Sequence, residues 1–411
     1  MKQKLITLLL PLFLSLLASE ALANGNKVNG ICYIFKGSEA TVTYDVNGTN
    51  NAATYKGDVV IPETVTYNGT TYTVTGIGNW AFQHCTNLTS VTLPSSITTF
   101  GDHAFYNCTN LTSFEIPNSV TIIGISAFEG CSGLTSIAIP NSVTTIYNHA
   151  FTGCSSLASV TIPNSVTDIP EYMFQGCSAL PEITIPSSVT SIGKYAFYEC
   201  SSLATATIPN SVTTLGERAF EKCSSLASLP LPASVTSFGQ SAFSYCTSLT
   251  SITIPYGLTT IGFYAFANCS GLEEAFIPSS ITSIGNGAFS NCNNLTKVKV
   301  NIKTPLPINV TYTFLNRTNA TLYVPKGSKA AYEKANYWKE FKKIIEIGDV
   351  NKDGSITVAD VTALVDILLG KDNIEPYMYD HVAADVDGDH NITITDVTAL
   401  VNIILGKENG E

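Results

Sequence analysis

Two acidic segments near the C-terminus carry the side chains whose types and spacing best suit chemistry. They begin at Asp349 and Asp385 and repeat one another at an offset of 36 residues. Each places oxygen-bearing side chains at positions 1, 3, 5, 9 and 12 of a twelve-residue loop, and the backbone carbonyl of position 7 can add a ligand. Several hard oxygens at flexible distances are the coordination that Ca²⁺ takes. The expected ligands are Asp349, Asn351, Asp353, Ser355, Thr357 and Asp360 in the first loop, and Asp385, Asp387, Asp389, Asn391, Thr393 and Asp396 in the second.

Each loop runs into an amphipathic helical segment, and the two segments also repeat one another. Duplicated loops with duplicated helices argue against two solvated acidic turns and favour an EF-hand-like pair. Ile356 and Ile392, at position 8, are expected to pair the loops through a short strand. Position 12 is Asp where EF-hands usually have Glu, and position 6 of the second loop is His390 where Gly is expected. A non-Gly residue there needs positive φ, so the second loop fits an ion less well than the first.

Asp at position 12 and the paired loop–helix units resemble a type I dockerin over residues 349 to about 406. The resemblance implies two Ca²⁺ ions and a cohesin-like module, or a cell-surface partner, as the binding partner. It also implies that loop positions 10 and 11 contribute to the partner surface. These are Val358, Ala359, Ile394 and Thr395, which are not the Ser-Thr pair of well-known cellulosome dockerins. Because packed carboxylates repel one another, we expect the tail to fold only with Ca²⁺.

The net charge of −11 is concentrated in this tail. Residues 349–411 hold 13 acidic and 3 basic side chains, whereas the preceding residues hold 19 and 18. With 45% hydrophobic and 13% charged residues, the chain is not a charge-driven disordered protein. An acidic chain without a dense basic cluster is also not expected to bind nucleic acid.

The elements that must carry this tail are indicated by the cysteines. Apart from Cys32, they recur every 23 residues, at 85, 108, 131, 154, 177, 200, 223, 246, 269 and 292. A disulfide framework has no reason to repeat one interval, so we expect thiols that act as small buried apolar residues. A fixed period of this length predicts a repeat solenoid, in which each coil buries its apolar residues only against its neighbours.

One 23-residue template describes the coils: C-x-x-L-x-x-V-x-I-P-x-S-V-T-x-I-G-x-x-A-F-x-x. Alternating residues such as Val160 and Ile162 predict a short strand with one buried face, which the following proline ends. The V-T-x-I segment predicts a second short strand, and the glycine after it is expected to let the chain turn into the Ala-Phe corner. Leu, Val, Ile, Phe and Cys should therefore stack in columns. The corners are expected to be turns or 3-10 helix.

The template resembles the BspA-like leucine-rich repeats of bacterial surface and secreted proteins, over residues 59 to 348. That resemblance implies a right-handed leucine-rich solenoid and a role in adhesion or protein binding. The expected domains are a signal peptide at 1–23, an N-terminal cap with a degenerate first repeat at 24–79, the solenoid at 80–300, a C-terminal cap at 301–348 and the small all-α calcium-binding tail at 349–411. Asn68-Gly69 signals a hairpin inside the first cap, and a helical stretch around 329–341 with Trp338 is expected to seal the far end.

The start of the chain predicts export. Lys2 and Lys4 precede an apolar run from Leu5 to Leu17, and a small-residue pattern predicts cleavage after Ala23. We therefore expect a secreted or cell-surface protein with no transmembrane segment after cleavage.

Neither the histidines nor the cysteines indicate catalysis. There is no His-x-x-x-His, nucleophile elbow or phosphate loop, and buried cysteines are poor nucleophiles. The position before each Ala-Phe is often aromatic and forms a candidate ligand surface, with Trp80, His103, His149, Tyr172, Tyr195 and Tyr264. These rings could bind a protein or a sugar, or could shield the corner.

We therefore expect a non-enzymatic binding protein that presents its solenoid to a macromolecular ligand, such as a host matrix protein, and attaches by its tail. The alternative is a glycan-binding accessory subunit of a dockerin–cohesin complex that degrades polysaccharides.

Overall fold

A computed structural model describes residues 25–44, 55–308, 312–351, 353–370, 381–388 and 391–407. The expected signal peptide, and Asp389 and His390 of the second loop, lie outside the described residues. The chain forms a β-solenoid of about 12 turns with repeats of about 23 residues. It divides into two compact units, Met1–Val166 and Thr167–Glu411. No helix in the described ranges is long and apolar enough to cross a membrane.

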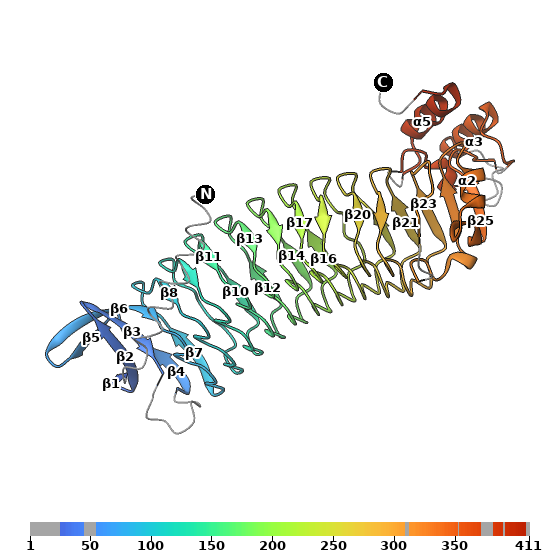
Figure 1. Ribbon diagram of the computed structural model, residues 1–411. Coiled ribbons are helices and arrows are strands. Elements are labelled where there is room, and N and C mark those ends of the chain that lie inside the picture. The colour runs from blue at the N-terminus through green and yellow to red at the C-terminus, as the bar shows by residue number, and fades with distance from the viewer. Residues whose placement is uncertain are drawn as a thin grey trace, which may run out of the picture. The chain divides into compact units, whose positions relative to one another are not determined.

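The first unit opens with hairpins and continues with parallel strands (Figure 1). Its strands are β1 (Asn26–Val28), β2 (Ile31–Lys36), β3 (Glu39–Thr43), β4 (Gly57–Val60), β5 (Thr64–Tyr67), β6 (Thr70–Ile77), β7 (Leu88–Thr92), β8 (Thr99–Phe100), β9 (Ile122–Ile123), β10 (Ser136–Ala138), β11 (Thr145–Ile146) and β12 (Ser159–Thr161). The predicted hairpin joins β5 to β6, with φ of 50° at Asn68 and 80° at Gly69, as a two-residue turn requires. β3 and β4 pair in parallel with β6 and β7 and so extend the ladders toward the N-terminus.

Both predicted strands of the repeat are present. β8, β9 and β11 pair in parallel with a register of 23 residues, for example Thr99 with Ile122, and β10 pairs with β12 in the same way. At the Ala-Phe corner the backbone forms a third ladder between coils, since Phe105 N donates to Ala127 O at 2.7 Å. The corners themselves are turns.

The phenylalanine column fills the interior of this unit. Phe82, Phe105, Phe128 and Phe151 are buried, and successive rings stack at 5.0, 5.1 and 5.4 Å. Stacking identical rings at the coil spacing gives each coil a large apolar contact with its neighbours. The expected columns are confirmed.

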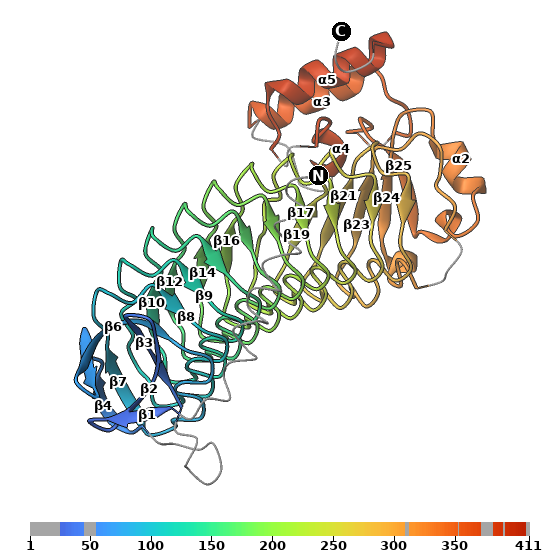
Figure 2. The same ribbon diagram turned by 60° about the vertical axis from the view of Figure 1, so that its left-hand side comes forward.

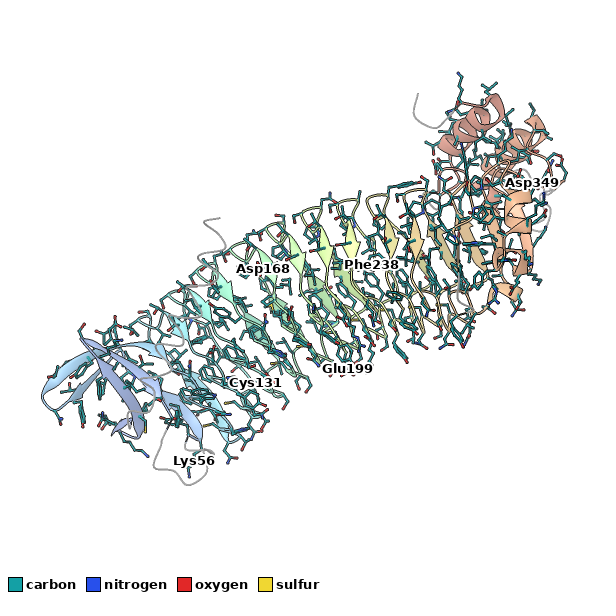
Figure 3. The ribbon with its side chains drawn as sticks, viewed as in Figure 1. Lys56, Cys131, Asp168, Glu199, Phe238 and Asp349 are labelled. Carbon is teal, nitrogen blue, oxygen red and sulfur yellow. The ribbon has the colours of Figure 1, made fainter. Side chains whose placement is uncertain are left out.

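The cysteine column lies beside it. All eleven cysteines are buried and none forms a disulfide. The thiol of Cys131 (Figure 3) donates to the carbonyl oxygen of Phe105 at 3.1 Å, and that of Cys108 donates to Phe82 O at 3.0 Å. The position therefore holds a small residue that also satisfies a buried carbonyl.

The repeated glycine has a different purpose from the one expected. Gly124 does not have positive φ, but a Cβ there would lie 2.6 Å from the backbone carbon of Gly101 in the preceding coil. It therefore permits close approach of two coils instead of a turn. The left-handed conformation falls two residues later and again before each of the ten repeat cysteines, as at Ser126 with φ of 53° and Gly130 with φ of 73°.

The second unit continues the repeat and adds the cap and the tail (Figures 1 and 2). Its strands are β13 (Asp168–Ile169), β14 (Glu182–Thr184), β15 (Ser191–Ile192), β16 (Thr205–Thr207), β17 (Thr214–Leu215), β18 (Ser237–Phe238), β19 (Ser251–Thr253), β20 (Thr260–Ile261), β21 (Glu274–Ile277), β22 (Ser283–Ile284), β23 (Lys297–Val300), β24 (Thr321–Val324) and β25 (Lys343–Glu346). Its helices are η1 (Arg317–Asn319), α2 (Lys329–Lys334), η2 (Trp338–Glu340), α3 (Val358–Leu368), α4 (His381–Ala384) and α5 (Ile394–Leu405).

The parallel ladder continues beyond the last repeat. β21, β23, β24 and β25 pair in order, so the cap adds two strands to the solenoid edge. The expected helical stretch at 329–341 is divided between α2 and η2, because Tyr337 between them takes φ of 74°. Trp338 is 1% exposed and packs against Phe314 and Phe341. The segment that was expected to seal the far end therefore contributes a buried aromatic cluster there.

Candidate metal centre and binding surfaces

The first acidic loop is closed by its own carboxylates. Asp353 Oδ1 accepts from Ser355 N at 2.8 Å, and Asp349 Oδ2 accepts from Gly354 N at 3.1 Å. Asp360 reaches back across the loop, where its oxygens accept from the backbone of Asn351 and Thr357. Position 6 is Gly354, whose φ of 87° suits the tight turn there. The side chain of Ser355 is exposed, which suits a ligand role for its backbone carbonyl.

One carboxylate oxygen of this loop is placed where a cation can bind it. Asp349 Oδ1 is buried and has no hydrogen-bond partner. Burial raises the pKa of Asp349, and the nearby carboxylates of Asp360 and Asp353 raise it further. The hydrogen bond from Gly354 N acts in the opposite direction and lowers it. A buried carboxylate oxygen without a donor, in a set of oxygen ligands, fits Ca²⁺. The residues present therefore fit the ion.

Helix capping holds the ends of both loops in place. Thr357 is the N-cap of α3 and accepts from Ala359 N at 3.1 Å, while Asp360 accepts from Thr357 N at 2.8 Å. Thr393 and Asp396 form the same capping box at the start of α5. Each box satisfies two helix-end donors and fixes the carboxylate of position 12 inside its loop.

The second loop gathers three carboxylates. Single oxygens of Asp385, Asp387 and Asp396 all lie within 4.8 Å of one another. Asp396 is fully buried and accepts from Val386 N at 2.7 Å, and burial raises its pKa. Gly388, at position 4, has φ of 84° and donates to Asp385 Oδ1 at 2.9 Å. Position 5, Asp389, lies outside the described residues, and the side chain of Asn391 is exposed.

The predicted strand between the loops is wrong for the described residues. Neither Ile356 nor Ile392 belongs to a strand. Both pack instead against an apolar cluster that includes Leu364 of α3 and Leu400 of α5. The two helices lie side by side (Figure 2) and pair the loops through their own contacts.

That cluster extends into the solenoid cap. Tyr323 of β24 and Ile345 of β25 belong to the same cluster as Leu364 and Leu400. Gly348 N also donates to Ala383 O at 3.0 Å. The tail is thus packed on the cap, a feature that the change in sequence pattern did not predict.

The predicted partner residues are open to solvent. Val358 and Ile394 are each 69% exposed, and Ala359 and Thr395 are exposed beside them. They begin α3 and α5, directly after the acidic loops. Leu369 and Leu405, at the other ends of these helices, are 68% and 63% exposed and were not predicted. Exposed apolar residues at matching places of both helices form a surface suited to a partner.

The aromatic column lies at the corners in a left-handed conformation. Trp80, His103, His149, Tyr172, Tyr195 and Tyr264 all have φ between 53° and 63°. The rings stack on one another, with Trp80 and His103 at 6.2 Å in the first unit and Tyr172 and Tyr195 at 4.7 Å in the second. Of these side chains, Tyr264 is 42% exposed.

A groove in the second unit is lined by residues that directly precede repeat cysteines, among them Glu199, Lys222 and Tyr245. Its volume is about 560 Å³. Lys222 and Glu199 (Figure 3) form an ion pair of 2.6 Å at its edge, and Tyr245 is 44% exposed. The remaining lining residues are small: Gly176, Ser178, Ser201, Ser224 and Thr247. The sequence analysis did not single out this groove.

Comparisons with known proteins agree with both parts. The family model of the BspA type leucine-rich repeat region matches residues 63–181 and 167–296, and that of the dockerin type I domain matches residues 347–405. A leucine-rich repeat protein from Bacteroides ovatus ATCC 8483 is 27% identical, with a TM-score of 0.54, and the match covers 78% of this chain and 99% of that one. A leucine-rich cell surface protein from Faecalibacterium prausnitzii A2-165 is also 27% identical, with a TM-score of 0.45 and coverage of 82% and 97%. No curated protein matches the chain.

Proposed function

The chain belongs to the BspA-type leucine-rich repeat proteins and carries a type I dockerin domain, and on this basis we propose that it is an exported, non-enzymatic binding protein. The dockerin, a calcium-binding type of domain, implies attachment to a cohesin. In the proposal, both loops bind Ca²⁺ and the tail docks on a cohesin-like module of a partner, while the solenoid binds a macromolecular ligand. Export through the signal peptide, with cleavage after Ala23, places it outside the cell or on a cell surface.

The observation that carries the attachment role is the duplicated exposed pair at the helix starts. Val358 and Ile394 hold equivalent places after the two acidic loops and are equally exposed. Ca²⁺ would neutralise the loop carboxylates and fix the helix starts that present these residues. Calcium and partner binding should therefore be coupled.

The test uses the full chain and purified cohesin modules from the source genome, immobilised on beads. We expect retention in Ca²⁺ and release in EGTA. Val358→Asp combined with Ile394→Asp should abolish retention, whereas Val60→Asp, at a residue 65% exposed in the first unit, should not change it. Retention that is unaffected by EGTA or by the double substitution would contradict the proposal.

For the solenoid ligand, the column of aromatic side chains supports a protein, such as a host matrix protein, because aromatic side chains offer a large contact area to a protein surface. The groove beside Tyr245 supports the second candidate, a glycan-binding accessory subunit of a polysaccharide-degrading complex. An exposed aromatic ring with nearby hydroxyls and charged groups offers stacking and hydrogen bonds to a sugar.

Affinity electrophoresis of the full chain in gels containing soluble polysaccharides separates the two. Retardation that Tyr245→Ala abolishes would favour the glycan role. Normal migration, together with capture of matrix proteins on a surface, would favour the protein role.

A further inference from the structure

Two residues of the solenoid contact the second acidic loop. Lys299 in β23 donates from Nζ to the backbone carbonyl of Asp385 and lies 3.2 Å from Asp385 Oδ2. Phe276 in β21 lies against Gly388, where a Cβ would be 3.2 Å from its ring. The ammonium of Lys299 is 5.7 Å from the centre of that ring.

Lys299 has an unusual environment for a lysine. It is 2% exposed, in a strand position that is threonine in several earlier coils. A buried ammonium needs a charged partner, because its desolvation is costly. The partner here is the position-1 carboxylate of a calcium loop, so the solenoid has placed a cation beside an expected ligand of Ca²⁺.

The two loops differ at this carboxylate. In the first loop, Asp349 Oδ2 accepts from Gly354 N and Asp349 Oδ1 has no protein partner. In the second, Asp385 Oδ1 accepts from Gly388 N and Asp385 Oδ2 is paired with Lys299. Lys299 therefore contacts one oxygen of the position-1 carboxylate in the second loop, whereas the position-1 carboxylate of the first loop keeps one oxygen without a donor.

We propose that Lys299 is a tethered competitor of Ca²⁺ at the second loop. The inference rests on the proposed calcium binding by both loops and adds a difference between them. An ammonium and a calcium ion on one buried carboxylate repel each other strongly, so the ion binds only when Lys299 withdraws. The second loop is therefore the weaker site, and its occupancy loosens the contact of Lys299 with the tail.

The first test measures Ca²⁺ binding to the full chain by isothermal titration calorimetry. Wild type should show a stronger and a weaker site, and Asp349→Ala should remove the stronger one. Lys299→Met should tighten the weaker site by about tenfold or more and leave the stronger one unchanged, because it removes the competing charge. Lys297→Met is the matched control, since Lys297 lies in the same strand but is exposed, and it should change neither site.

The outcomes separate the two proposals. If no ion binds to wild type, the proposed calcium function fails. If two ions bind and Lys299→Met leaves the weaker site unchanged or weakens it, only the competition is overturned.

A second measurement uses unmodified protein, in case Lys299→Met does not fold. Amine labelling followed by mass spectrometry should find Lys299 protected at a Ca²⁺ concentration that fills only the stronger site and modified in saturating Ca²⁺, while Lys297 is modified in both. Equal protection of Lys299 at the two Ca²⁺ concentrations would overturn the competition.

Discussion

Cys131 donates its thiol hydrogen to the carbonyl oxygen of Phe105, 3.1 Å away and 26 residues earlier in the chain. The same relation joins Cys154 to Phe128 in the first unit and Cys269 to Phe243 in the second. The column thus combines two requirements of a tight coil: a side chain small enough for the interior and a donor for a buried carbonyl.

Replacing Cys131 by Ala should remove one of the two hydrogen bonds that Phe105 O accepts, the other being donated by Cys108 N at 3.2 Å. We expect a loss of about 0.5–1.5 kcal/mol in the free energy of unfolding of the first unit, the net value of one hydrogen bond. Urea unfolding of the full chain measures it. Ser132→Ala, at the half-buried neighbouring residue, should stay within about 0.5 kcal/mol. Equal effects of the two substitutions would show that the hydrogen bond from the Cys131 thiol does not contribute to the free energy of unfolding.

The buried thiols should make stability depend on alkaline pH. Burial raises the pKa of Cys200, Cys246 and Cys292 to about 12. In the unfolded chain a thiol ionises at about pH 8.5, so above that pH the unfolded state holds fewer protons than the folded state. Stability should be full below this pH and fall as pH rises toward 12. The urea midpoint should therefore be lower at pH 9.5 than at pH 7.5. An equal midpoint at the two pH values would contradict this.

Thiol labelling gives an independent check of the same column. Native protein at pH 8 should react negligibly with an alkylating reagent, whereas protein unfolded in urea without reductant should expose all 11 thiols. Near-zero labelling of the unfolded, unreduced protein would mean that the cysteines are paired.

Glycine has two different functions in the first unit, and two substitutions distinguish them. Gly124→Ala brings a Cβ to 2.6 Å from the backbone of Gly101, which cannot move aside, so a loss above about 2 kcal/mol is expected. Gly153 has φ of 70°, and a Cβ added there would lie 3.7 Å from the nearest atom of Gly130. Gly153→Ala should therefore cost only the strain of a left-handed conformation, about 1 kcal/mol. Chemical unfolding compares them, and the reverse order would refute the close-approach explanation.

Local pattern predicted the parts of this fold that depend on neighbours in sequence. The 23-residue period predicted both strands of the repeat, and Asn68-Gly69 predicted the hairpin. The duplicated loops predicted where acidic side chains gather. The left-handed corners were missed because residues as large as Tyr172 occupy them, and their φ is imposed by hydrogen bonds to the next coil, such as Tyr172 N to Lys194 O. Gly287 in the same column was the one local signal.

The contact of Lys299 with Asp385 could not be predicted from spacing. It joins residues 86 apart through the packing of the tail on the cap, which no local preference determines. Phe276 and Lys299 did depart from a column otherwise rich in threonine, as at Thr207 and Thr253. Such a departure marks a changed environment but does not identify what covers it.

Removing calcium should unfold the tail while leaving the coils intact. Asp349, Asp353 and Asp360 converge in the first loop, and without a cation their charges repel one another. In EGTA we expect the helical circular dichroism of α3 and α5 to fall and to return when Ca²⁺ is added, with Mg²⁺ less effective because it requires a stricter geometry. Protection of the thiols reports the solenoid in the same samples and should not change. Helical signal that is insensitive to EGTA would refute the prediction, as would thiols that become reactive together with the loss of helix.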